Sequence, residues 1–157
     1  MPRLTMAMAS CMDRSSAPTQ IAISAQDIER MCRDVEARRP EEACGLLAGR
    51  FERGAARVEA VLPMQNALHS PARYRLDAAE QIRAFAWIEA QGLELTGIYH
   101  SHPEGPAVPS ATDIAEAYYP QAVYWIWSGQ NGAWQYAAFT IHQGEIAPVT
   151  ILTGSGE

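Results

Sequence analysis

Lysine is absent from this chain of 157 residues, and all 12 basic residues are arginine. Without lysine the chain cannot form a Schiff base or use a lysine nucleophile. It also offers no lysine side chain to which a ubiquitin-like protein could be attached. The 18 acidic residues give a net charge of −6, so electrostatics favour neither nucleic acid nor an anionic membrane as a partner.

Cysteine is scarce too, since only Cys11, Cys32 and Cys44 occur and they are widely spaced. An odd number at this spacing is not the pattern of a disulfide framework. No Cys-x-x-Cys pair is present, which argues against a zinc site built from cysteines. Reduced thiols are typical of the cytoplasm, and we therefore expect a cytoplasmic protein.

Long apolar runs are also missing. No stretch approaches the roughly 18 apolar residues of a membrane span, and the N-terminus lacks the sustained apolar segment of a signal peptide. Residues 1–19 are expected to be a disordered leader, or to include a true start at Met6, Met8 or Met12. Residues 20–157 are enough for one domain with a core and too few for two.

The predicted elements alternate between strands and helices, which indicates an α/β fold with a mixed sheet flanked by helices. Ser24, Asp77 and Ser110 are suitable N-caps for three helices. The Asn131-Gly132 pair predicts a hairpin between the first two of the last three strands. We expect strands at 21–24, 43–48, 57–64, 95–100, 122–127, 134–141 and 145–152, and helices at about 25–39, 77–91 and 111–118.

The helix at 77–91 has the strongest pattern. Glu80 is expected to complete a capping box with Asp77, and Gly92 to end the helix. Its inner face is predicted to comprise Ile82, Phe85, Ala86 and Ile88.

His100-Ser101-His102 lies at the end of a predicted strand. Because alternate strand residues point to the same side, His100 and His102 can converge on one ion while Ser101 faces away. Asp113 lies in the first turn of the helix opened by Ser110, and the proline-rich loop between can fold that turn over the strand end. Two imidazoles and a carboxylate suit Zn²⁺, and three protein ligands leave a position for water, as in catalytic sites.

Such a site needs a base, and Glu42 leads into the apolar segment 43–48. A carboxylate at that point can lie beside the zinc without being enclosed in the core. It can take a proton from water and deliver it to the leaving nitrogen. Ser110, at a helix N-terminus, offers a hydroxyl donor to a developing oxyanion.

The run HSHPEGPAVPSATD at 100–113 resembles the H-x-H-P…S-x-x-D signature of the JAMM, or MPN-plus, zinc metalloproteases. PEEACGLLAG at 40–49 resembles the segment that carries the family's catalytic glutamate. The resemblance covers most of residues 21–150 and is greatest to small stand-alone bacterial members. It implies a cytidine-deaminase-like α/β fold, with zinc on His100, His102 and Asp113. It also implies Glu42 as acid/base, chosen over Glu41 by aligning the Leu-Leu-x-Gly run, and Ser110 as oxyanion support.

The resemblance implies hydrolysis of an amide at the C-terminal tail of a ubiquitin-like or sulfur-carrier β-grasp protein. The enzyme would be a peptidase that trims a sulfur carrier, which we favour, or an isopeptidase that releases a modifier from lysine. The loops 65–76 and 103–109 are expected to line a groove for the tail. The identity of the substrate protein and the oligomeric state are not predicted.

Two other classes of function remain as alternatives. A non-catalytic MPN scaffold would lack a histidine, aspartate or glutamate of the motif, and none is missing. A zinc nucleobase deaminase would carry H-x-E…P-C-x-x-C, which is absent.

Overall fold

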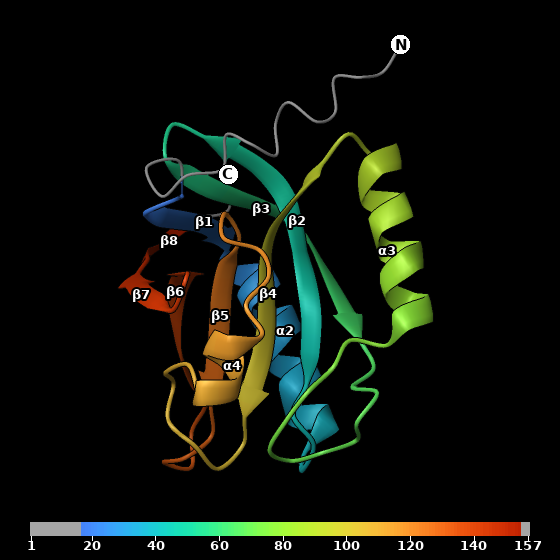
Figure 1. Ribbon diagram of the computed structural model, residues 1–157, viewed down its shortest axis with the longest axis vertical. Helices are drawn as coiled ribbons and strands as arrows, with labels where there is room; N and C mark the ends of the chain where they lie inside the picture. Colours follow the sequence, from blue (N-terminus) through green and yellow to red (C-terminus); the bar gives the residue numbers. More distant parts are fainter. Residues whose placement is uncertain (1–16, 155–157) are drawn as a thin grey trace.

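The computed structural model describes residues 17–154 as an eight-stranded mixed sheet with helices on both faces (Figure 1). Most of the leader expected at residues 1–19 lies outside the described residues. The elements, in chain order, are β1 (Gln20–Ser24), α2 (Ala25–Arg38), β2 (Cys44–Glu52), β3 (Ala55–Met64), α3 (Ala78–Ala90), β4 (Glu94–His102), α4 (Ala111–Ala115), β5 (Val123–Ser128), β6 (Gln135–His142), β7 (Glu145–Pro148) and β8 (Thr150–Gly154).

The strand order is β7-β6-β5-β4-β2-β3-β1-β8, so β4 lies near the centre of the sheet. β4 is parallel to β5 and antiparallel to β2. The hairpin expected around Asn131-Gly132 is present, because β5 and β6 pair as antiparallel neighbours. The predicted α/β fold with a mixed sheet is confirmed.

Two hydrophobic cores lie on the two faces of the sheet. Alternation along the strands sends Leu47 and Tyr99 to the core beneath α2, and Leu46 and Ile98 to the core beneath α3. In Figure 1, α2 lies behind the sheet and α4 in front of it. Trp125 and Trp127 are buried in the α2 core, and the partly buried Trp134 packs against it.

The last predicted strand, 145–152, is in fact two strands. β7 pairs with β6 at one edge of the sheet, while β8 pairs with β1 at the other. Because only Val149 separates β7 from β8, the sheet must curl until its two edges approach each other. The amide of Val149 donates to the carbonyl of Ala138 (2.9 Å), which fixes this crossing point.

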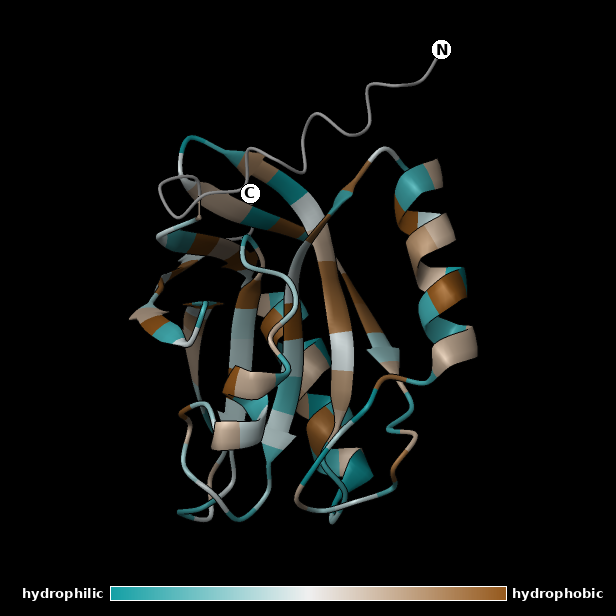
Figure 2. Cartoon of the chain, in the orientation of Figure 1, coloured by the Kyte–Doolittle hydropathy of each residue, from teal (hydrophilic) through white to brown (hydrophobic). Residues whose placement is uncertain are grey.

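The prediction for the inner face of α3 was partly wrong. Ala84 and Ile88 are buried, whereas Ile82 is 71% exposed and Ala86 is exposed. Residues two positions apart on a helix point in nearly opposite directions, so Ile82 and Ala86 cannot share a face with Ala84. The helix is apolar along most of its length (Figure 2), so the sequence pattern did not distinguish its faces.

Two element boundaries and one capping interaction also differ from expectation. β2 continues past Gly49 to Glu52, with a register shift there, and a Cβ on Gly49 would collide with the carbonyl of Arg57. α4 ends at Ala115 rather than near residue 118. The Glu80 carboxylate accepts from the amide of Gln65 (2.7 Å) instead of completing a capping box.

None of the helices within residues 17–154 is long and apolar enough to cross a membrane.

Candidate metal centre

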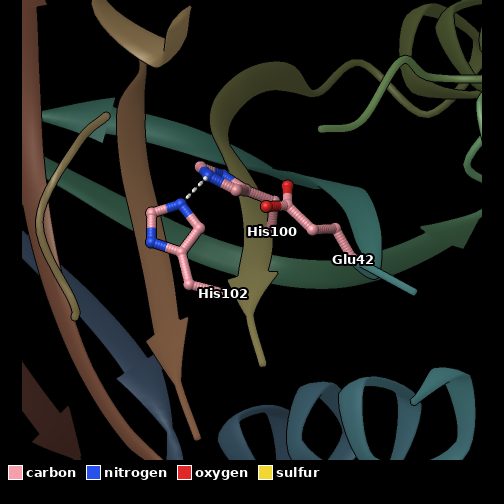
Figure 3. Close-up of side chains that lie close together, drawn as sticks. All are labelled: Glu42, His100 and His102. Carbon is pink, nitrogen blue, oxygen red and sulfur yellow. Dashed lines mark hydrogen bonds between the residues drawn. The ribbon is translucent and has the colours of Figure 1, made fainter. Parts of the chain in front are cut away.

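The end of β4 brings two imidazoles together. His100 and His102 lie on one side of the strand, and their Nε2 atoms are 3.0 Å apart. Figure 3 shows both rings turned towards one region, with Glu42 beside them. His100 is fully buried and His102 is 9% exposed. Ser101, as expected, faces the other way.

Asp113 joins this pair through the cap of α4. The hydroxyl of Ser110 accepts from the amide of Asp113 (3.0 Å), and the amide of Ser110 donates to Asp113 Oδ2 (2.8 Å). This capping box aims Oδ2 at the histidines, 3.1 Å from His100 Nε2 and 3.2 Å from His102 Nε2. Burial opposes ionisation, but the hydrogen bonds to both histidines outweigh it and hold the pKa of Asp113 well below its ordinary value.

Each histidine ring is fixed by a contact on its outer side. His102 Nδ1 lies 2.8 Å from the carbonyl of Pro106, and a proton on Nδ1 leaves Nε2 with its lone pair directed at the cluster. The ring of Tyr74 stacks on His100, with centroids 4.4 Å apart. Burial lowers the pKa of His100, which favours the neutral imidazole that a metal requires.

The three donor atoms fit a small cation. Their separations of 3.0 to 3.2 Å are near the roughly 3.3 Å between ligands of a tetrahedral zinc ion with bonds of roughly 2.0–2.1 Å. Ligand atoms of Glu42, His100 and His102 also lie within 4.8 Å of one another. Of the two carboxylates, Asp113 is the one that lies within hydrogen-bond distance of both imidazoles.

Glu42 lies two residues before the start of β2 and is 5% exposed. Burial is the main cause that raises its pKa to about 7; the charge of Asp113 adds to the shift and His102 opposes it. A carboxyl group with such a pKa is suited to exchange protons near neutral pH. The neighbouring Glu41 points elsewhere, with its carboxylate 3.4 Å from His69 Nδ1.

The structure thus brings together four of the five residues singled out in the sequence. The fifth, Ser110, is hydrogen-bonded to one of them, Asp113. Two residues were missed. Tyr74 was assigned to a loop, and nothing in its sequence context signals the stacking on His100. Asn66, 1% exposed, donates to the carbonyl of Glu42 (3.1 Å), but an asparagine after a strand is usually a turn residue.

A pocket of about 240 Å³ borders Asp113. Residues 72–76 form one side of it, α4 and the segment after it form another, and Ile98 lies between them. Of the loop expected at 65–76, residues 72–76 therefore line a cavity beside the cluster. The proline-rich loop 103–109 contributes no residue to this pocket, although it fixes His102 through Pro106.

Comparison with known proteins identifies close relatives. Residues 24–141 match the family described as prokaryotic homologs of the JAB domain. A probable TtuB-protein conjugate cleaving protease of Thermus thermophilus is 39% identical over 114 residues, which are 72% of this chain and 70% of the relative. A CysO-cysteine peptidase of Mycobacterium tuberculosis is 39% identical over 104 residues, 66% of this chain and 70% of that protein. A desampylase of Haloferax volcanii is 43% identical over 90 residues, 57% and 63% of the two chains.

Solved structures agree with this assignment. The solution structure of DSY2949 from Desulfitobacterium hafniense has a TM-score of 0.78 at 32% identity, covering 86% of this chain and 93% of that one. A JAB1/MPN domain protein from Archaeoglobus fulgidus has a TM-score of 0.53 at 15% identity, covering 85% and 98%, and shares the fold. The resemblance noted from the motifs is confirmed.

Proposed function

This chain belongs to the family of prokaryotic homologs of the JAB domain and is a peptidase of that family, and from this premise we propose that it uses zinc to hydrolyse an amide at the C-terminal tail of a ubiquitin-like or sulfur-carrier protein. The observation that carries the proposal is the convergence of His100 Nε2, His102 Nε2 and Asp113 Oδ2 within 3.2 Å, beside the buried carboxyl of Glu42.

Zinc, when bound, supplies a Lewis acid that acidifies water and polarises a carbonyl. The residues of this chain supply the rest. Glu42 accepts a proton from the attacking water and passes it to the leaving nitrogen. The hydroxyl oxygen of Ser110 accepts a hydrogen bond from the backbone amide of Asp113 (3.0 Å). Its hydroxyl hydrogen therefore remains available to stabilise an oxyanion.

The relatives' names support the class of substrate, because one relative is named as a probable TtuB-protein conjugate cleaving protease and another as a CysO-cysteine peptidase. We favour trimming of a sulfur-carrier tail over release of a modifier from lysine. We further propose that the enzyme acts in the cytoplasm on such a carrier. A non-catalytic scaffold is disfavoured, since all of the motif side chains are present and four of them lie together.

Two matched substrates would test this function. One is a sulfur-carrier protein ending in Gly-Gly plus one further residue, and the other is the same carrier joined through its tail to a lysine. Mass spectrometry should find release of the extra residue from the first. Cleavage of the lysine conjugate alone would replace trimming with the isopeptidase role, and cleavage of neither, with zinc bound, would contradict the proposed class of substrate.

A further inference from the structure

Asn66 follows β3 and is among the most buried polar residues described, at 1% exposure. Its side chain bonds backbone groups at both ends of the loop 65–76, beside an isolated antiparallel bridge between Asn66 and Leu76. The amide nitrogen Nδ2 donates to the carbonyls of Glu42 (3.1 Å), Ser70 (3.3 Å) and Arg73 (2.9 Å), and Oδ1 accepts from the amides of Leu68 (3.0 Å) and Arg75 (3.1 Å).

Both backbone polar groups of Glu42 depend on this arrangement. The carbonyl of Glu42 accepts from Asn66, and its amide donates to the carbonyl of Ser70 (2.8 Å), which Asn66 also contacts. Within residues 17–154, the carboxylate of Glu42 forms no side-chain hydrogen bond or ion pair of its own. Its position relative to the histidines is therefore set by its backbone and by packing.

The same carboxamide also holds Tyr74. Asn66 bonds the carbonyl of Arg73 and the amide of Arg75, which are the residues on either side of Tyr74. The ring of Tyr74 packs on His100 and borders the pocket beside Asp113. One buried side chain thus fixes the backbone beneath the base and beneath the residue that covers a metal ligand.

We propose that Asn66 is a positioning residue that couples the substrate-facing loop 65–76 to Glu42. This inference rests on the proposed function, in which Glu42 transfers the proton. Only a carboxamide has donors on one side and an acceptor on the other. Aspartate has the same shape, but it would direct an oxygen at three carbonyl oxygens. Alanine would remove a hydrogen-bond partner from all five backbone groups.

The first test compares the full-length variants Asn66→Asp and Asn66→Ala with Thr96→Val. Thr96 is a suitable control because it is fully buried and its hydroxyl donates to the carbonyl of Leu47 (3.0 Å), away from the loop. The Asn66 variants should keep about one zinc per chain and lose roughly 10- to 100-fold in kcat, as expected for a misplaced catalytic group. Thr96→Val should lower the melting temperature without this loss.

A double-mutant cycle with Glu42→Gln separates positioning from general damage. If Asn66 acts through Glu42, adding Asn66→Ala to Glu42→Gln should lower the residual turnover by less than about threefold, since interacting residues are not additive. If the loss of turnover in the double variant instead equals the product of the losses in the two single variants, the inference would be overturned.

Amide hydrogen exchange tests the same coupling without any substrate. The Glu42 amide, which donates to Ser70, should exchange at least about tenfold faster in the Asn66 variants than in the wild type or in Thr96→Val. Unchanged exchange at Glu42 would overturn the inference. If the wild type cleaved no carrier protein, the proposed function would fail, and the exchange rates would still decide whether Asn66 holds Glu42.

Discussion

Ala43 and Ser101 exchange two hydrogen bonds between the segments that carry the two parts of the site. The amide of Ala43 donates to the hydroxyl of Ser101 (2.8 Å), and the amide of Ser101 donates to the carbonyl of Ala43 (3.0 Å). Ala43 adjoins Glu42, and Ser101 lies between His100 and His102. The proposed base and the two histidines proposed as ligands are therefore on separate segments that are bonded directly to each other, so mutation should separate their roles.

Loss of one ligand should remove the metal. The purified protein should hold about one zinc per chain, and His100→Ala or Asp113→Ala should lose most of it, because two remaining donors make a poor zinc site. Elemental analysis after gel filtration measures this directly.

His69→Ala is the matched control, since His69 is exposed and paired with Glu41 outside the cluster. It should keep the full zinc content. Full zinc retention in both ligand variants would contradict the ligand assignment.

Glu42→Gln should keep the fold and the zinc but lose turnover. Glutamine is nearly isosteric with glutamate and cannot accept the proton, and general acid–base catalysis typically contributes ~10²–10⁴-fold. We therefore expect kcat to fall by at least ~100-fold in a carrier-cleavage assay.

Glu41→Gln is the control for this variant, because Glu41 is the adjacent carboxylate and its side chain is near His69. Its activity should stay close to that of the wild type. The reverse pattern, with collapse in Glu41→Gln alone, would mean that the other glutamate is the base.

The stability of the chelator-treated protein should depend on pH through Glu42. Its pKa is raised from 4.5 to about 7, so its contribution to the free energy of unfolding is full below pH 4.5 and is lost as the pH rises through about 7. This shift corresponds to on the order of 3 kcal/mol. Glu42→Gln should therefore be more stable than the wild type at pH 8, with little difference at pH 4.5.

Urea unfolding of both proteins at the two pH values would measure this difference. Asp113 and His102 are present in both proteins, so the difference between the two proteins reports on the Glu42 carboxyl and its interactions with these neighbours. An equal stability difference at pH 4.5 and pH 8 would show that burial does not raise the pKa of Glu42.

Sequence reasoning predicted the parts of the site that follow from local geometry. The same-side placement of His100 and His102 follows from the two-residue repeat of a strand, and the approach of Asp113 follows from the cap at Ser110. The family segment also led to Glu42 rather than Glu41. These are short-range relationships, or relationships fixed by a motif.

The parts that were missed depend on contacts distant in sequence. Asn66 bonds Glu42 across 24 positions, and Tyr74 packs on His100 through a loop that has no periodic pattern. The split between β7 and β8 was missed because both halves read as one apolar run, and only the partner strands β6 and β1 distinguish them. The outer face of α3 was misassigned because that helix is apolar on several sides.

The absence of side chains at the end of the substrate tail should be required for cleavage. A Gly-Gly end has no side chains, so backbone hydrogen bonds would recognise it, and glycine allows the chain to approach the site closely. Replacing the penultimate glycine of a carrier tail with valine should block cleavage by steric clash while the carrier still binds. Retained cleavage of the valine form would exclude a narrow channel for the tail.

The folded body of the carrier should contribute to recognition as well. A short tail offers few contacts beyond the pocket beside Asp113, which holds only about 240 Å³. The β-grasp body would supply the remaining contact area, and a free peptide must also lose conformational entropy on binding. We therefore expect kcat/KM for an intact carrier to exceed that for its isolated C-terminal hexapeptide by at least roughly 100-fold, the equivalent of about 3 kcal/mol. Competition assays at matched concentrations would measure this ratio. Equal kcat/KM values for the two substrates would rule out recognition of the body and indicate a general peptidase.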